Sequence, residues 1–127
     1  MSSANVEVVK ASMDAAQAGN VEAALAGYAE DVVFHPLVAG PYHGRQGVVE
    51  QMMTWMAEFD DFWFESEDYL DAGERVVLLW RQGGKGKSSG VEVMTEGATV
   101  MVVVGGFIRE AFVYSDRDKA LRSAGLK

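Results

Sequence analysis

The chain has 127 residues, of which 49% are hydrophobic and 24% are charged, and these values are typical of one globular domain over residues 1–127. The net charge of −8 has the wrong sign for following a phosphate backbone or an anionic membrane surface, so neither nucleic acid nor membrane is an expected partner. The chain has no cysteine, which excludes disulfides and thiolate zinc sites. Because residues 1–18 lack the features of a signal peptide and no apolar run approaches the roughly 20 residues of a membrane span, we expect a cytoplasmic protein.

Hydrophobic spacing predicts two helices at the start of the chain. The apolar residues of the first helix recur at helical intervals, at Val6, Val9, Met13 and Ala16. Gly19 can close this helix, and Asn20 is a suitable N-cap for a second, short helix that we expect to end near residues 30–31. A short strand at residues 32–35 should follow, stopped by Pro36.

The rest of the chain predicts one further helix and then a run of strands. From Gly47 onward one helix face is apolar, with Val48, Met52, Trp55, Met56 and Phe59. Four strands are expected at residues 63–71, 75–82, 91–104 and 107–114, with the glycine-rich segment 83–90 as a flexible hairpin connection. Asp116 can cap a closing helix that ends at Gly125. This order of elements predicts an α+β fold, not the alternation of a parallel α/β sheet.

Two of the predicted strands are apolar on both faces. In Val76–Trp80 and Val100–Val104 the hydrophobic residues do not alternate with polar ones, which is typical of a strand covered on both sides. Helices or an enclosed pocket can cover one side. A second copy of the chain can cover the other, so we expect a homodimer that forms through the sheet.

Several familiar motifs are absent or incomplete. The segment Gly86-Lys87-Ser88 resembles a phosphate loop, but Arg81 stands where the pattern needs a glycine, and strands rather than a helix flank it. His35 and His43 are eight residues apart with no nearby cluster of carboxylates, so no metal site is expected. The chain has no Gly-x-Ser-x-Gly elbow for a nucleophilic serine. We therefore expect neither a metal nor an organic cofactor.

Large aromatic and methionine side chains are more numerous than a core of this size needs. Such side chains line pockets for flat apolar ligands, although they can equally pack a core or a dimer interface. The candidates for pocket lining are Tyr28, Phe34, Met52, Trp55, Phe59, Trp63, Trp80 and Met101. The sequence thus predicts a largely apolar pocket.

His35 is the candidate base. It ends a predicted strand beside Pro36 and is flanked by Phe34 and Leu37. In an apolar pocket, burial favours the neutral imidazole, which can accept a proton. The alternative is a buried core histidine whose hydrogen bonds are satisfied.

Three segments resemble SnoaL-like proteins of the nuclear-transport-factor-2-like superfamily. They are residues 18–34 (AGNVEAALAGYAEDVVF), residues 42–47 (YHGRQG), and residues 106–121 (GFIREAFVYSDRDKAL). The resemblance implies a cone, in which a strongly curved mixed sheet wraps over the N-terminal helices and leaves one pocket at the wide end, often with dimerisation through the sheet. Members include steroid isomerases, polyketide cyclases, dehydratases and epoxide hydrolases, most of which use acid/base chemistry without a cofactor.

The resemblance carries over to the site only in part. His35 stands where the isomerase-like members have a catalytic aspartate, whereas Ser12 or Met13 stands where they have an oxyanion-hole tyrosine. Val113 matches the position of the epoxide hydrolases' aspartate, and Trp80 and Gln82 fall near their Arg-x-Asp pair. The matches also suggest that alternate strand residues face the pocket, namely Leu78, Trp80, Gln82, Arg109, Ala111 and Val113.

These observations favour a small-molecule pocket protein. One hypothesis is a cofactor-independent lyase or isomerase, similar to a cyclase or dehydratase, that acts on a hydrophobic molecule. In it His35 is the base, and Arg109, Gln82 or Tyr114 polarises a carbonyl group. The alternatives are a non-catalytic small-molecule-binding module and a dimeric interaction domain, because no second catalytic group clearly accompanies His35.

Overall fold

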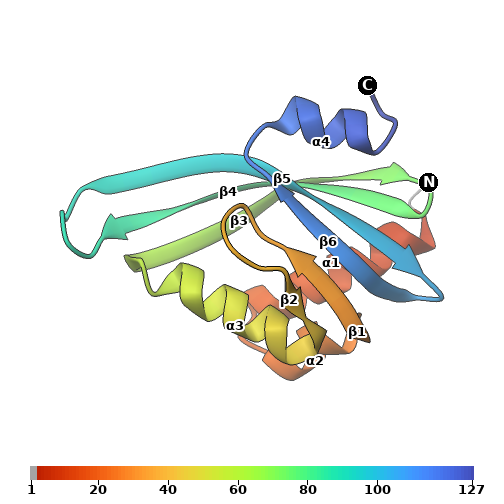
Figure 1. The fold of residues 1–127 in the computed structure, drawn as a ribbon, viewed down its shortest axis with the longest axis horizontal. Helices are drawn as coiled ribbons and strands as arrows, with labels where there is room; N and C mark the ends of the chain where they lie inside the picture. The colour runs from red at the N-terminus through yellow and green to blue at the C-terminus, as the bar shows by residue number, and fades with distance from the viewer. Residues whose placement is uncertain (1–2) are drawn as a thin grey trace.

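The computed structural model describes residues 3–127, so the first two residues of the predicted domain lie outside it (Figure 1). In chain order the elements are α1 (Ala4–Gln17), α2 (Val21–Ala26), β1 (Tyr28–His35), β2 (Tyr42–His43), α3 (Gly44–Met56), β3 (Phe59–Ala72), β4 (Arg75–Gly86), β5 (Glu92–Val104), β6 (Phe107–Tyr114) and α4 (Arg117–Ser123).

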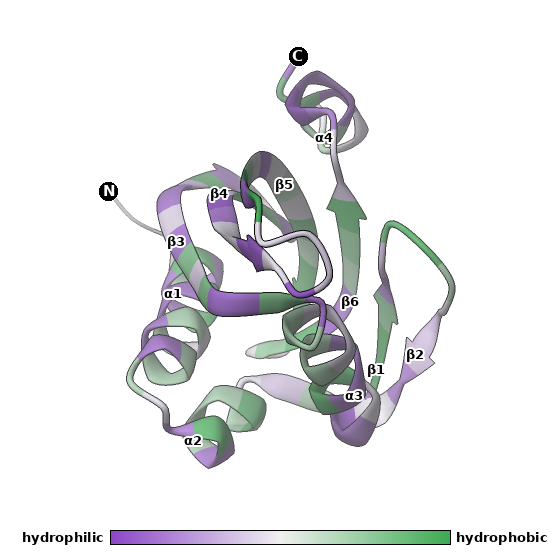
Figure 2. Cartoon of the chain, turned by 90° about the vertical axis from the view of Figure 1, so that its left-hand side faces the viewer, coloured by the Kyte–Doolittle hydropathy of each residue, from purple (hydrophilic) through white to green (hydrophobic). Residues whose placement is uncertain are grey.

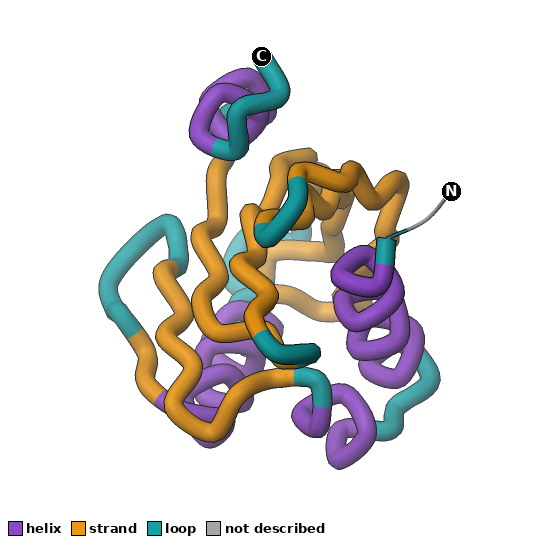
Figure 3. The backbone as a smooth tube through the Cα atoms, turned by 90° about the vertical axis from the view of Figure 1, so that its right-hand side faces the viewer, coloured by secondary structure: helices purple, strands orange, loops and turns teal. Residues whose placement is uncertain are grey.

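The six strands form one curved, unclosed sheet in the order β2-β1-β6-β5-β4-β3. All neighbouring strands are antiparallel except β1 and β6, which run parallel, so the sheet is mixed. Helices α1, α2 and α3 lie on one side of the sheet and α4 lies on the other (Figures 1 and 3). The predicted α+β fold, with a curved sheet over the N-terminal helices, is confirmed. We call the side that faces α1 the inner face and the side that faces α4 the outer face.

The predicted helix caps are present. The Asn20 side chain accepts a hydrogen bond from the backbone N–H of Ala23 and so caps α2. The Asp116 side chain accepts hydrogen bonds from the N–H groups of Asp118 and Lys119 and caps α4. Gly19, after α1, has a φ of +80°, a left-handed conformation that glycine adopts without strain.

Several boundaries differ from the prediction. Strand β3 begins at Phe59 rather than at residue 63, so Phe59, which was predicted on the face of the preceding helix, lies in the sheet. Strand β1 begins at Tyr28, where the sequence predicted helix, because Tyr28 pairs with Ile108 of β6. Helix α3 begins at Gly44 rather than Gly47. Strand β4 continues through the glycines to Gly86 instead of ending at Gln82, since Gly83 and Lys85 each pair with both β3 and β5. Glycine suits this stretch because a Cβ atom on Gly84 would lie 2.8 Å from the carbonyl oxygen of Asp60.

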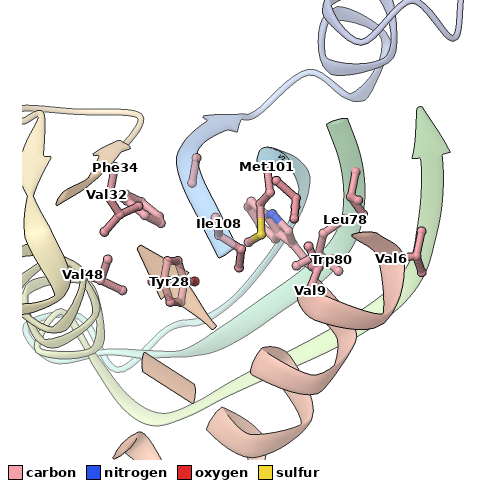
Figure 4. Close-up of a cluster of buried hydrophobic side chains, with 13 residues drawn as sticks. Val6, Val9, Tyr28, Val32, Phe34, Val48, Leu78, Trp80, Met101 and Ile108 are labelled. Atoms are coloured by element: carbon pink, nitrogen blue, oxygen red, sulfur yellow. The ribbon is translucent and has the colours of Figure 1, made fainter. Parts of the chain in front are cut away.

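The main hydrophobic core fills the space between the inner face and the helices (Figure 4). Its buried members are Val6, Val9, Tyr28, Val32, Phe34, Val48, Val76, Leu78, Trp80, Met101, Val103, Ile108 and Ala111. They come from α1, α3 and four of the strands, so the core packs the first helix against strands from the second half of the chain. We call this set the inner cluster.

A second, smaller cluster lies on the outer face, beneath α4. Val77, Ala98 and Val100 of the sheet are buried together with Ala120 of α4, and half-buried residues such as Phe112 pack around them. We call this set the outer cluster. Helix α4 therefore covers one side of the strands that the sequence showed to be apolar on both faces. The homodimer through the sheet stays a prediction, and its surface would be the part of the outer face that α4 leaves open.

No helix among the described residues is both long enough and apolar enough to cross a membrane.

Candidate functional site

The candidate base, His35, is held between β1 and β6. It pairs with Phe112 across the two strands, and the two rings stack with their centroids 4.4 Å apart and their planes 1° from parallel. Its Nε2 lies 3.0 Å from Oε2 of Glu110, and its side chain is 35% exposed. A carboxylate in this position orients the imidazole, so the sequence analysis missed one functional neighbour, Glu110. Only the pairing of two strands far apart in sequence brings it to His35.

His35 lies on the outer face of the sheet. Side chains alternate along a strand, and the preceding residue, Phe34, belongs to the inner cluster. The stacking partner, Phe112, packs against the outer cluster. The expectation that His35 faces a pocket inside the cone is therefore corrected, because the two faces are separated by the thickness of the sheet.

The three other candidate catalytic residues do not converge on His35. The guanidinium of Arg109 forms an exposed ion pair with Asp31, with an N–O distance of 3.2 Å. Tyr114 packs against the outer cluster, whereas Gln82 is buried with 8% of its surface exposed. Arg109 also departs from the predicted alternation, because a bulge in the β5–β6 pairing lets both Ile108 and Ala111 face inward.

Most of the predicted pocket residues pack against one another in the inner cluster. Tyr28, Phe34, Leu78, Trp80, Met101 and Ala111 are buried members of it, and Val113 packs against it. Met52 and Trp63 are instead about 40% exposed, at 39% and 40%. Trp55 and Phe59 are half-buried beside α3. The residues predicted to line one pocket are thus divided between a closed core and the end of the sheet next to α3.

An aromatic row runs from α3 across the inner face to the core, and we define it as Trp55, Phe59, Phe62, Phe64 and Trp80. The ring centroids of Trp55 and Phe59 are 5.9 Å apart, those of Phe59 and Phe62 are 6.2 Å apart, and those of Phe64 and Trp80 are 6.0 Å apart. Gly84 lies against the first half of the row, since a Cβ atom there would lie 3.0 Å from Cβ of Phe59 and 3.3 Å from Cα of Phe62. Figure 2 faces this end of the molecule, with α3 in front of the sheet.

Two polar groups accompany the aromatic row. The indole N–H of Trp55 is buried and has no hydrogen-bond partner among the described residues. Gln82 pairs with Phe64 across β3 and β4, and its amide offers both donors and an acceptor at the inner face. By contrast, the N–H of Trp80, deeper in the core, donates to Oγ1 of Thr99 at 2.9 Å. Buried polar groups normally have a partner, so the unpaired Trp55 N–H marks a place where a ligand acceptor could bind.

The surface of the described residues contains at least two hollows. One has a volume of about 530 Å³ and is lined by Asp61, Trp63, Gly84, Lys85, Glu92, Val93 and Met94. The other has a volume of about 320 Å³ and is lined by Ala29, Glu30, Arg45 and Phe107. Neither is lined by a candidate catalytic residue, and Trp63 is the one predicted pocket residue that either contains. The residues described also contain no group of three or more side chains that could hold a metal ion.

Tyr28 is the buried titratable group of the inner cluster. Its burial raises the pKa of the phenol from 10.0 to about 12, against the smaller opposing effect of a hydrogen bond with Ser12. The folded protein therefore keeps the proton that the unfolded chain loses near pH 10. This contribution to stability is complete below pH 10 and is lost as the pH rises to about 12.

We expect Tyr28→Phe to remove this alkaline loss, which amounts to about 2–3 kcal/mol because each unit of pKa corresponds to ~1.4 kcal/mol. Urea unfolding at pH 8, 10 and 11.5 measures it. Tyr114→Phe on the outer face is the matched control and should keep the wild-type pH dependence. Equal alkaline slopes for wild type and Tyr28→Phe would contradict the assignment.

The curved mixed sheet with three helices on its inner face defines an α+β protein of the nuclear-transport-factor-2-like fold. The chain belongs to the SnoaL-like domain family, whose model matches residues 9–111. No curated protein matches the sequence.

Solved structures share the fold over nearly the whole chain. An NTF2-like protein from Burkholderia thailandensis superposes with a TM-score of 0.80 at 21% identity, covering 96% of this chain and 95% of that one. An NTF2-like protein of unknown function from Burkholderia pseudomallei gives a TM-score of 0.78 at 20% identity, with coverage of 95% and 97%. TerC, co-crystallised with polyporic acid, gives a TM-score of 0.76 at 18% identity, with coverage of 97% and 99%. At these identities the likeness concerns the fold.

Proposed function

We propose that the protein binds a small, largely apolar molecule that carries a hydrogen-bond acceptor, at the end of the inner face beside α3. The observation that carries the proposal is the buried, unpaired N–H of Trp55, which lies at one end of the aromatic row. Aromatic side chains supply apolar contact area, and a few placed polar groups fix the orientation of a ligand.

The arrangement of the aromatic row supports a flat ligand. Its neighbouring rings are 5.9–6.2 Å apart, which leaves edges and faces that an inserted ring system can contact after small side-chain rotations. The amide of Gln82 faces the same side of the sheet and can donate to a carbonyl oxygen. The co-crystallisation of TerC with polyporic acid supports a small-molecule role for a protein of this fold.

The proposal concerns binding and does not extend to a lyase or isomerase reaction. Acid/base catalysis needs a base within hydrogen-bond reach of the proton that it removes, directly or through one water. His35 and its partner Glu110 lie on the outer face, whereas Gln82 and the aromatic row lie on the inner face. A molecule bound beside Trp55 therefore has the sheet between it and His35.

A matched pair of compounds tests the proposed site. We expect 2-acetylnaphthalene to raise the melting temperature by mass action and to bind more tightly than 2-ethylnaphthalene, which has the same shape without the carbonyl. In Gln82→Leu this preference should fall by about 5–10-fold in Kd, since one hydrogen bond contributes roughly 1 kcal/mol. Tryptophan fluorescence and thermal shift measure both compounds.

Gln46→Leu, the same substitution at an exposed position of α3, is the control and should leave the preference unchanged. Failure of both compounds to bind the wild type would contradict the apolar site. Binding of both with no preference for the ketone would contradict the role of the polar groups.

A further inference from the structure

The larger hollow lies at the projecting end of β3, β4 and β5 (Figure 1), and none of its lining residues belongs to the aromatic row. Trp63 of β3 and Met94 of β5 both pair with Gly83 of β4, so their side chains stand on the same face on either side of a glycine. Gly83 has no side chain on this face, so β4 forms a low floor between the two neighbouring strands. The next residue, Gly84, is one of those that line the hollow.

Trp63 rests directly on that floor. A Cβ atom on Gly83 would lie 3.0 Å from Cε2 and Cζ2 of the indole, so the ring packs against the glycine backbone. The rest of the residue remains open, with 40% of its surface exposed. A large aromatic surface is therefore held in place inside the hollow and is available to a ligand.

Charged side chains surround the indole. A bulge in β3 between Asp60 and Trp63 places Asp61 in the hollow, where it adopts a φ of +53°. Glu92 and Lys85, which face each other across β4 and β5, complete the charges that line it. Two carboxylates and one ammonium leave a net charge of −1. None of the ion pairs among the described residues involves these three side chains.

We propose that this hollow binds an organic cation with an apolar body, of the substituted-ammonium class. The face of an indole attracts such cations more strongly than other aromatic rings do, and the thioether of Met94 is a soft, polarisable wall for the methyl groups. The carboxylates of Asp61 and Glu92 add electrostatic attraction, as does the net charge of −8 of the whole chain. The volume of about 530 Å³ suits a small organic ligand.

Lys85 provides a direct test of the proposal, because its ammonium lines the same hollow and repels a cationic ligand. Replacing Lys85 by methionine keeps a long apolar stem and removes the repelling charge. A cation should then bind more tightly, whereas an anionic ligand would bind more weakly. Tighter binding after the loss of Lys85 is therefore the result that distinguishes a cationic ligand from an anionic one.

Three probes of one shape separate charge from size: choline, the neutral 3,3-dimethylbutan-1-ol and the anionic 3,3-dimethylbutanoate. We expect choline to shift the indole N–H resonance of Trp63 at low ionic strength and to bind about 3-fold or more tightly than the alcohol, with the anion weakest, as a cation–π contact of ~0.5–1 kcal/mol implies. Added salt should weaken only the choline titration.

Lys85→Met should strengthen choline binding by about 3-fold, and Asp61→Asn should weaken it by a similar factor. Lys10→Met, an exposed lysine of α1, is the matched control and should change neither titration. Trp63→Leu should reduce the preference for choline over the alcohol to the part that the carboxylates contribute. The proposal is overturned if the alcohol binds the wild type as tightly as choline does, or if Lys85→Met weakens choline binding.

Discussion

Replacing Trp80 by alanine should lower the free energy of unfolding by about 3–5 kcal/mol, the range observed when a large aromatic side chain is removed from a closed core. Trp80 is 4% exposed and belongs to the inner cluster. Its ring packs on Gly97 of the neighbouring strand, where a Cβ atom would lie 2.7 Å from the indole. The surrounding strands cannot easily collapse onto the vacated volume, since β4 is paired on both sides.

Chemical denaturation of the wild type, Trp80→Ala and Trp80→Phe measures this loss. The phenylalanine variant retains a ring but leaves Oγ1 of Thr99 without its donor, so it should lose roughly 1–2 kcal/mol. The alanine variant should also melt about 10–20 °C lower. A loss of less than about 1 kcal/mol for Trp80→Ala would show that Trp80 borders an open cavity rather than a closed core, and would move the ligand site deeper into the cone.

Replacing Arg117 by methionine should lower the free energy of unfolding by about 2–4 kcal/mol, because its guanidinium holds α4 to the sheet. Arg117 donates to the carbonyl oxygens of Trp80 at 2.8 Å and Gly97 at 3.1 Å. It also pairs with Glu67 at 2.9 Å and with Glu96 at 3.7 Å. Its side chain is only 24% exposed, and methionine fills much of the stem's volume while leaving these acceptors without their donor.

The matched control is Arg122→Met, an exposed arginine of the same helix, which should change stability by less than about 0.5 kcal/mol. The pH dependence offers a second measurement. Arg117 lowers the pKa of Glu67 from its ordinary value of 4.5, so the stability from this pair is present above that value and is lost as the pH falls. Arg117→Met should weaken this acid dependence, and equal stability of Arg117→Met and wild type at neutral pH would contradict the role of Arg117.

The proposed ligand site and the proposed cation hollow lie at the same end of the molecule but can be tested separately. The first depends on Trp55 and Gln82 at the inner face, and the second depends on Trp63 and Lys85 around the glycine floor of β4. A variant of one site should therefore leave the ligand of the other unaffected. This separation also allows either proposal to fail alone.

Local chemistry in the sequence was sufficient to determine much of this protein. Caps at Asn20 and Asp116 act on their own helix ends, so their effect needs no distant partner. Helical spacing in residues 6–16 and the run of strands after residue 59 likewise report local burial, and they predicted the α+β class. The resemblance to SnoaL-like proteins extended this prediction from the α+β class to a curved mixed sheet.

Only the tertiary structure decided where the candidate site residues lie. His35 faces outward because the preceding residue, Phe34, is packed into the inner cluster, and Arg109 leaves the predicted alternation because β6 carries a bulge; neither feature has a local signal. The doubly apolar strands required two covers, but their sequence could not distinguish α4 from a second copy of the chain. The hydrophobic pattern indicates that a residue is buried. Strand pairing and packing determine which face of the sheet it lies on and which residues it contacts, and both depend on residues far apart in the chain.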